Sequence, residues 1–311
     1  MSNALITIGL PTYNRAATLK RAILSVLAQD YSDLELIISD NASTDETEFL
    51  CQELCRQDVR IRYLRQLENQ GAAANFQTVL DHARGEFFMW LADDDWLDPR
   101  YLSECLRTFA ESPGHELVCG RGKYFDGDQF RFAEDPINLD QDSSWQRVLS
   151  YYRQVGINGM FYGLMRRGSL ASLKLQESLG ADWLLMAQVA CLGKVRTLEH
   201  VFLNRSIAGA SQKVETLALN QGHSPVVAKN AHLLIAYTIF KDVAWKSSVY
   251  QPLGKLRRLS LAANSAVAVA KKHSFTPGLN KLLDRWNRLR TRLILRTRLK
   301  RGLRRIFRRV L

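Results

Sequence analysis

The sequence predicts an α/β protein in which helices cover both faces of a mostly parallel sheet. In residues 1–95, four short apolar runs alternate with segments whose apolar residues recur at helical spacing. That alternation is typical of a parallel sheet covered on both faces. The 311 residues, 46% apolar and 24% charged, also suffice for a large core of ordinary globular composition.

The elements of this first part follow one another with short polar connections. The first strand is predicted in ALITIGLP, where the apolar run stops at Pro11. A helical stripe follows in residues 17–29. The remaining elements are a strand at 34–40, a helix at 46–57 with Ser43, Thr44 or Asp45 as N-cap, a strand at 61–66, a helix at 71–84 and a strand at 85–95.

The pattern weakens after Pro99. Helices are predicted at 101–111, 145–155 and 181–192, a Gly/Asp-rich stretch at 120–130, a strand-like segment at 157–167, and mostly helix-forming sequence at 225–270. The sequence therefore predicts an α/β domain at 1–215, a helical extension at 216–280 and a basic amphipathic helix at 281–311.

The net charge of +12 is concentrated in the last helix. Residues 281–311 hold 13 Lys and Arg and one acid, Asp284, whereas the first 280 residues are neutral. The body therefore gives no reason to expect a nucleic-acid surface. In the tail, Leu282, Trp286, Leu289 and Leu293 form an apolar stripe among arginines, which predicts binding to an anionic membrane surface. Two alternatives are packing on the domain or a partner helix, and binding of nucleic acid.

The five cysteines predict reduced thiols and a cytoplasmic protein, because the chain shows no export signal and their spacing suits no zinc site. No run of about 18 apolar residues is present, so no membrane span is predicted. Together with the tail, this predicts a peripheral location on the inner face of the cell membrane.

Three carboxylates follow the fourth predicted strand, in WLADDDW. Ligands of parallel sheets bind outside the carboxyl ends of the strands, and this is one such end. Adjacent carboxylates there predict a Mg²⁺ or Mn²⁺ site at Asp93, Asp94 and Asp95, with the metal shared by substrate phosphates. The alternative is that Asp95 or Asp98 caps the next helix.

Four segments occur in a specific order: ITIGLPTYNR, LELIISDNASTD, ENQGAAANFQTVLDHARGEFFMWLADDDW and GADWLLMAQVACLG. Together they resemble the family 2 glycosyltransferases, which share the GT-A fold, over residues 4–212. The resemblance implies inverting transfer of a sugar from a nucleoside-diphosphate donor, here expected to be a UDP-sugar, with Mn²⁺ or Mg²⁺ as cofactor. The expected acceptor is a glycan or a lipid-linked glycan, the latter because it fits a membrane-associated tail, and the expected role is in cell-surface polysaccharide synthesis.

The resemblance assigns roles by matching position. Pro11, Thr12 and Tyr13 match a loop that borders the nucleoside base, Asp40 matches an acid that accepts from the base or ribose, and Asn69, Gly71 and Asn75 match a stretch lying along the nucleotide. For Asp40 the alternative is a turn that closes the strand, and for Gly71 a plain helix start. The metal motif falls on Asp93, Asp94 and Asp95, although Ala92 stands where many relatives have an acid.

The catalytic base of the family matches Asp182, in the motif GADW. A carboxylate opposite the leaving group can take the proton of the attacking hydroxyl. Ala181 replaces a supporting acid of the family pattern, and the alternative role of Asp182 is an N-cap. Arg205 stands near a position where relatives carry a histidine, and is expected either to bind diphosphate or to be a surface arginine.

Two other functions compete with a glycosyltransferase. A nucleotidyltransferase would also combine a parallel sheet with acidic metal ligands, but the first strand is not followed by a Gly-rich basic loop. A non-catalytic nucleotide-sugar-binding assembly protein would not need Asp182.

Overall fold

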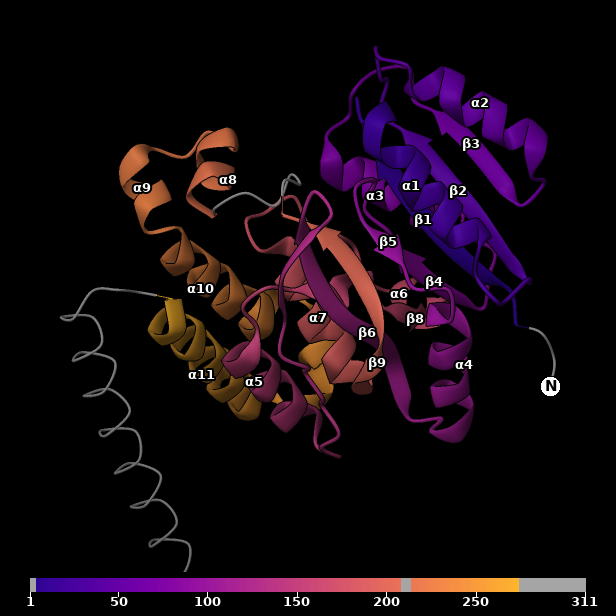
Figure 1. Ribbon diagram of the computed structural model, residues 1–311. Coiled ribbons are helices and arrows are strands. Elements are labelled where there is room, and N and C mark those ends of the chain that lie inside the picture. Colours follow the sequence, from indigo (N-terminus) through magenta and orange to yellow (C-terminus); the bar gives the residue numbers. More distant parts are fainter. Residues whose placement is uncertain (1–3, 208–213, 274–311) are drawn as a thin grey trace, which may run out of the picture.

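The computed structural model describes residues 4–207 and 214–273. Within these residues nine strands form one sheet in the order β3-β2-β1-β4-β8-β6-β9-β5, with β7 paired to β6 (Figure 1). The strands are β1 (Ile6–Thr12), β2 (Leu34–Asp40), β3 (Ile61–Arg65), β4 (Phe87–Trp90), β5 (Trp96–Leu97), β6 (His115–Asp126), β7 (Gln129–Ala133), β8 (Leu164–Arg166) and β9 (Lys194–Ser206). Strands β3, β2, β1 and β4 are mutually parallel, as are β6 and β9, whereas β8, β5 and β7 pair antiparallel. The predicted α/β class is confirmed.

Helices lie on both faces of the sheet, as predicted. They are α1 (Ala16–Leu27), α2 (Thr47–Gln57), α3 (Ala72–Asp81), α4 (Tyr101–Glu111), α5 (Ser144–Gln154), α6 (Arg167–Leu170), α7 (Ala181–Leu192), α8 (Val214–Asn220), α9 (Pro225–Lys229), α10 (Ala231–Lys241) and α11 (Lys255–His273). Short 3₁₀ segments occupy Gly159–Tyr162 (η1) and Ser248–Leu253 (η3), and Asp242–Lys246 (η2) is π-helical. Among the described residues, no helix is both long and apolar enough to cross a bilayer.

The alternation of side chains along the strands creates two cores. Ile8 of β1 and Met89 of β4 belong to the core under α1, α2 and α4. Ile37 and Trp90, which point to the opposite face, belong to the core under α3, α5 and α7. Each fully buried side chain of this kind contributes about 1.5–3 kcal/mol, so both faces of the sheet are fixed by burial.

The helical extension belongs to the second of these cores. Ile235 and Ile239 of α10 and Leu261 of α11 are buried in the cluster that also contains Trp90 and Trp183. Figure 1 shows α10 and α11 beside α5 and α7, at the end of the molecule away from β3. The extension is therefore held in a fixed position relative to the sheet.

Two segments differ from their prediction. The Gly/Asp-rich stretch lies largely within β6, whose glycines serve close packing: a Cβ at Gly120 would lie 2.6 Å from the Tyr101 ring, and one at Gly122 would lie 2.8 Å from Glu134. The strand-like segment 157–167 contains η1 and only a short strand, β8. The predicted basic helix at 281–311 lies outside the described residues.

Candidate active site

The carboxyl ends of β1, β2 and β4 meet at one edge of the sheet, because the three strands are parallel neighbours. Thr12, the last residue of β1, is paired in register with Asp40, the last residue of β2. The acidic triplet follows β4 directly. The polar residues that follow β1 and β2 and the acidic triplet after β4 are therefore brought together.

Asp40 is fully buried and shapes the loop after β2. Its carboxylate accepts hydrogen bonds from the Ser43 backbone N–H (2.8 Å) and the Tyr63 hydroxyl (2.6 Å). The first of these closes a turn, as in the alternative considered for Asp40. A contact of Asp40 with a base or ribose stays a prediction.

Asn75 and Asn69 hold the neighbouring loops together. The Asn75 amide donates to the carbonyls of Thr12 (3.2 Å) and Ser39 (2.9 Å), so α3 is tied to the ends of β1 and β2. The Asn69 Oδ1 accepts from the Gly71 N–H (2.9 Å). Gly71 is the N-cap of α3 and has φ +85°, a conformation that favours glycine. Tyr13 is 43% exposed at the same edge.

The three aspartates of the triplet have different surroundings. Asp93 accepts a hydrogen bond from the Thr12 hydroxyl at 2.8 Å. Asp95 is buried and accepts from Arg205 Nε at 2.9 Å and from the Ser206 N–H at 3.1 Å. Asp94 is half-buried, and no other residue in the described part of the chain forms a hydrogen bond or ion pair with its side chain. Asp94 is thus the member of the triplet most available to a ligand.

Burial also sets the protonation of the triplet. It raises the pKa of Asp93 to about 6, with a further rise from Asp94, while the Thr12 hydrogen bond and Arg15 lower it. Burial likewise raises the pKa of Asp94, against the effect of Arg15 and Arg205. Within the described ranges, no three Asp, Glu, His or Cys side chains form a ready-made metal cluster. A cation here would need ligands from a substrate as well.

Arg205 is buried, so the expected alternative of a surface arginine is wrong. Its guanidinium lies 4.7 Å from the centroid of the Tyr162 ring and donates to the Tyr124 hydroxyl at 3.0 Å. That hydroxyl in turn donates to Glu134 Oε2 at 3.1 Å. Burial lowers the pKa of Arg205, but the Asp95 carboxylate, Tyr162 and Tyr124 together more than reverse this, so the side chain stays charged.

Asp182 lies in the first turn of α7, whose N-cap is Gly180 rather than Asp182. Its Oδ2 accepts a hydrogen bond from the Asn158 amide at 2.9 Å, and the Tyr151 hydroxyl donates to Asn158 Oδ1 at 3.1 Å. Burial raises the pKa of Asp182, whereas the Asn158 hydrogen bond lowers it. A carboxylate with a raised pKa in this setting is suited to take up a proton.

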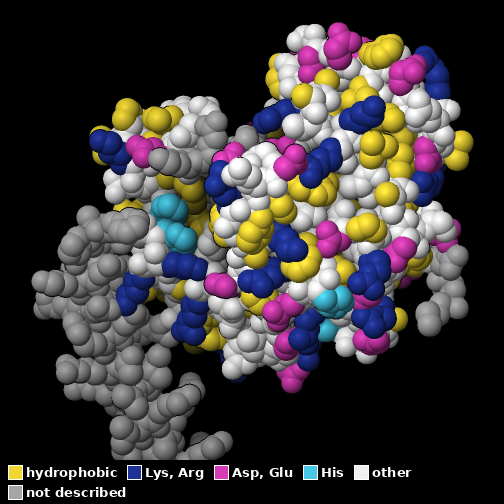
Figure 2. Space-filling model, in the orientation of Figure 1, with side chains coloured by type: hydrophobic (Ala, Val, Ile, Leu, Met, Phe, Trp, Pro, Cys, Tyr) yellow, Lys and Arg dark blue, Asp and Glu magenta, His cyan; other side chains and the backbone are white. Residues whose placement is uncertain are grey.

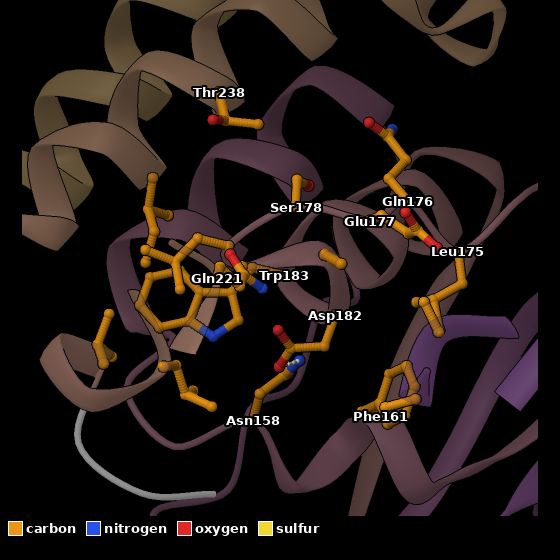
Figure 3. Close-up of a pocket in the computed structure, with 18 of the residues that line it drawn as sticks. Asn158, Phe161, Leu175, Gln176, Glu177, Ser178, Asp182, Trp183, Gln221 and Thr238 are labelled. Atoms are coloured by element: carbon orange, nitrogen blue, oxygen red, sulfur yellow. Dashed lines mark hydrogen bonds between the residues drawn. The ribbon is translucent and has the colours of Figure 1, made fainter. Parts of the chain in front are cut away.

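A cavity of about 1350 Å³ connects these groups, because both Asp182 and Arg205 line it. Figure 3 shows the Asp182 carboxylate meeting the Asn158 amide, with Trp183 and Phe161 on either side. The ion pair of Arg205 with Asp95 therefore joins the acidic triplet to the wall that carries Asp182. Asp182 and Arg205 belong to different elements of the chain, α7 and β9, yet both border this cavity.

Several contributors to the site were missed in the sequence. Asn158, Tyr124, Tyr162 and Glu134 all come from the region where the pattern weakens. Buried polar residues of this kind carry no periodic signal, because their role depends on contacts across β6, β9 and η1. The glycines of the 115–126 segment were the one available sign of close packing.

The comparison with protein families shows to which family the chain belongs. The family model described as Glycosyl transferase family 2 matches residues 7–172, which is more than half of the chain. The chain belongs to this family. The family resemblance predicted from the four motifs is confirmed.

Individual relatives match parts of the chain. A GalNAc(5)-diNAcBac-PP-undecaprenol beta-1,3-glucosyltransferase of Campylobacter jejuni is 40% identical over 111 residues, covering 35% of this chain and 36% of its own. An Escherichia coli chondroitin synthase is 34% identical over 258 residues, covering 81% of this chain and 35% of its own. The chain thus spans about a third of the length of these two relatives.

Solved structures share the fold at low identity. Residues 1–349 of S. aureus TarS, in complex with UDP-GlcNAc, align with a TM-score of 0.54 and 16% identity, covering 85% of this chain and 81% of that one. The expected GT-A type of sheet is therefore found in this family 2 chain, with further helices after it.

Proposed function

We propose that this family 2 chain is an inverting glycosyltransferase that moves a sugar from a nucleoside-diphosphate donor, a UDP-sugar, to an acceptor hydroxyl. One observation carries the proposal. The half-buried Asp182 carboxylate faces the same cavity as Arg205, which is ion-paired with Asp95 of the acidic triplet. A proton acceptor and an arginine that is paired with the acidic triplet thus border one space large enough for two substrates.

Asp182 acts as the general base in this proposal. Its carboxylate takes the proton of the acceptor hydroxyl while that oxygen attacks the anomeric carbon, and the bond to the diphosphate breaks on the opposite side. Asn158 fixes the orientation of the carboxylate through its 2.9 Å hydrogen bond. Inversion follows because the base and the leaving group stand on opposite faces of the sugar.

The donor set at the triplet fits a divalent cation held jointly with a diphosphate. Asp94, with support from Asp93, would hold Mn²⁺ or Mg²⁺, since such ions commonly bind one or two carboxylates plus substrate phosphates. Asp95 does not fit as a ligand, because Arg205 and the Ser206 N–H already engage its carboxylate. A bound cation supplies positive charge that stabilises the departing diphosphate.

The nucleoside end of the donor is proposed to lie along the loops after β1 and β2. Pro11, Thr12 and the exposed Tyr13 would border the base, and Gly71 would allow close approach of the backbone. Asp40, Asn69 and Asn75 are engaged in hydrogen bonds between these loops. In this arrangement they shape the nucleoside pocket, and Arg205 orients Asp95 beside the diphosphate.

The acceptor is proposed to be a glycan or a lipid-linked glycan, in cell-surface polysaccharide synthesis. Relatives support this class: one is named as acting on a diphosphoundecaprenol-linked saccharide, and another is named chondroitin synthase. A lipid-linked acceptor suits an enzyme held at the inner face of a membrane by residues 281–311. Lys and Arg are interspersed with Asp and Glu on the face in Figure 2, which offers no single-sign surface for nucleic acid.

The experiment that tests the proposal measures nucleoside diphosphate release from a panel of nucleotide sugars with Mn²⁺ and saccharide acceptors. Asp182→Asn should lower kcat by about 10²–10⁴-fold, because general base catalysis is lost. The matched control is Asp128→Asn, since Asp128 is an exposed aspartate distant in sequence, paired with Arg21. Full transfer activity in Asp182→Asn would overturn the assignment of the base. A binding protein without catalysis would release no diphosphate in any arm.

A further inference from the structure

The cavity that contains Asp182 has two walls of different origin. One wall comes from the α/β part and includes Phe161 of η1 and Trp183 of α7. The other comes from the helical extension and includes Leu217 of α8, Gln221 just after it, and Thr238 of α10. Figure 3 shows Gln221 and Thr238 across the space from Asp182. The extension is thus part of the site rather than an appendage to it.

The size of the cavity leaves room for more than the transferred sugar. Its volume of about 1350 Å³ exceeds the upper range of about 1000 Å³ typical of a pocket for one small ligand. The diphosphate side lies toward Arg205 and Asp95. The space between Trp183 and the extension remains for the acceptor.

The side chains of this acceptor space have the chemistry of a saccharide site. The Trp183 indole N–H and the Gln221 amide form no hydrogen bond with any residue in the described part of the chain. Aromatic rings with a polar edge pack against the apolar faces of sugars, and amides can both donate to and accept from their hydroxyl groups. Unused donors and acceptors facing a cavity mark it as a place for a polar ligand.

The charged side chains that line the cavity disfavour acidic saccharides. Among the described residues that line the cavity, the acids are Glu177 and Asp182, and the permanently charged base is Arg205. Arg205 is already ion-paired with Asp95 at 2.9 Å. A uronic acid or phosphorylated saccharide would bring a further negative charge near two carboxylates, and the described lining offers it no unpaired Arg or Lys.

We infer that the helical extension selects the acceptor, and that it takes an uncharged saccharide held between Trp183 and Gln221. The inference rests on the proposed function for the identity of the bound molecule as acceptor. It assigns Gln221 as a specificity-determining residue. It also explains why a helix outside the matched family region, α8, lines the same cavity as Asp182.

The test compares pairs of saccharides that differ in one carboxyl group: p-nitrophenyl β-glucoside against β-glucuronide, and β-galactoside against β-galacturonide. Binding to the full chain with UDP present is measured by saturation-transfer NMR. In each pair the neutral glycoside should bind about 10-fold tighter, because the uronide meets unpaired negative charge. Gln221→Ala should weaken neutral binding by about 3- to 10-fold, as expected for a lost hydrogen bond.

The Gln221→Arg variant is the most informative, because it places a positive charge in the cavity wall where the acceptor is proposed to bind. It should narrow or reverse the preference within each pair, whereas Leu219→Arg should not. Leu219 lies two residues before Gln221, near the end of α8, is exposed, and does not line the cavity. Equal binding of uronide and neutral glycoside by the wild type, no binding of either neutral glycoside, or an unchanged preference in Gln221→Arg would overturn the inference.

The outcome is separable from that of the proposed function. Asp182→Asn should lose transfer and, because it removes one of the two lining carboxylates, should narrow the preference for the neutral glycoside without reversing it. If Asp182→Asn loses transfer but Gln221→Arg has no effect on preference, the inference fails and the catalytic proposal stands. If the preferences follow Gln221 but Asp182→Asn transfers normally, the base assignment fails and the saccharide site stands.

Discussion

At the scale of single residues, the site depends on buried polar groups that are held by other buried polar groups. The Asp182 carboxylate is hydrogen-bonded by Asn158, which is itself held by the Tyr151 hydroxyl. Asp95 is held in the same way by Arg205. In a low-dielectric interior such contacts decide both the orientation and the protonation of a carboxylate.

The Asn158 contact makes a prediction about pH. Burial raises the pKa of Asp182, and transfer requires the deprotonated form, so activity should fall as pH drops through a value above the usual range of aspartate. Asn158→Leu removes a hydrogen bond that favours the charged form, so the acid limb of kcat/KM should move to higher pH. Tyr151→Phe should cause a smaller shift in the same direction. A pH profile identical to that of the wild type in Asn158→Leu would show that the contact does not tune the base.

The triplet makes a prediction that separates its members. Asp95→Asn leaves the buried Arg205 without its charge partner and should lower the free energy of unfolding by about 3–5 kcal/mol. Asp94→Asn should change stability by less than about 1 kcal/mol, because Asp94 is half-buried and unpaired among the described residues. It should instead abolish activation by Mn²⁺. Urea unfolding and a Mn²⁺ titration of activity measure the two effects, and equal loss of stability in both variants would contradict the distinction.

At the scale of secondary structure elements, the nucleotide-side loops are positioned by the close approach of α3 to β1. Gly9 of β1 lies directly under this helix: a Cβ there would lie 2.6 Å from Val79 Cγ2 and 2.9 Å from the Phe88 ring. The missing side chain lets α3 approach, and Asn75 on that helix can then reach the Thr12 carbonyl.

Gly9→Ala is therefore expected to cost about 1–3 kcal/mol of unfolding free energy through overpacking. The matched control is Gly168→Ala, because an added Cβ there meets no atom within 4 Å. Chemical denaturation of both variants checks the prediction. A Gly9→Ala variant as stable as Gly168→Ala would mean that α3 moves away from β1 without penalty.

The parallel half of the fold and its acidic edge could be predicted because their signals are local. The apolar runs ending before Thr12, Asp40 and Asp93 are each a few residues long and repeat the same pattern. β6 was missed because Gly120 and Gly122 have the composition of a turn, although they serve packing in a strand. Asn158 could not be found, because its contact with Asp182 depends on how η1 and α7 pack.

At the scale of the whole molecule, we predict separable roles for the described body and the basic tail. The tail at 281–311 lies outside the described residues, and the described core ends in α11, where Leu261 and Val269 are buried. Deletion of residues 281–311 should therefore leave the melting temperature of the body unchanged. It should abolish sedimentation with anionic liposomes, if about 1 kcal/mol per basic residue holds the chain at the surface. Undiminished liposome binding by the shortened chain would exclude the tail as the anchor.

Within the described body, buried hydrogen bonds join the helical extension to α7, and α7 to α5. Asp242 of η2 is fully buried and accepts hydrogen bonds from Gln188 of α7 at 3.1 Å and from Gln176 at 3.1 Å. Arg147 of α5 donates to the carbonyls of Ala190 (2.8 Å) and Cys191 (3.0 Å), fixing the other end of α7. The helix that carries Asp182 is thus held by Arg147 at its C-terminal end and by Asp242 at Gln188.

This shared core has a consequence for engineering. Chimeras in which residues 214–273 alone are transplanted from a relative would set foreign side chains of α10 and α11 against native α5 and α7, which belong to the same buried cluster. Swaps intended to alter acceptor choice should instead carry residues 144–273 as one block, which keeps α5, α7, α10 and α11 together. The grafted block must then still fit Ile37, Val79 and Trp90, which belong to the same cluster.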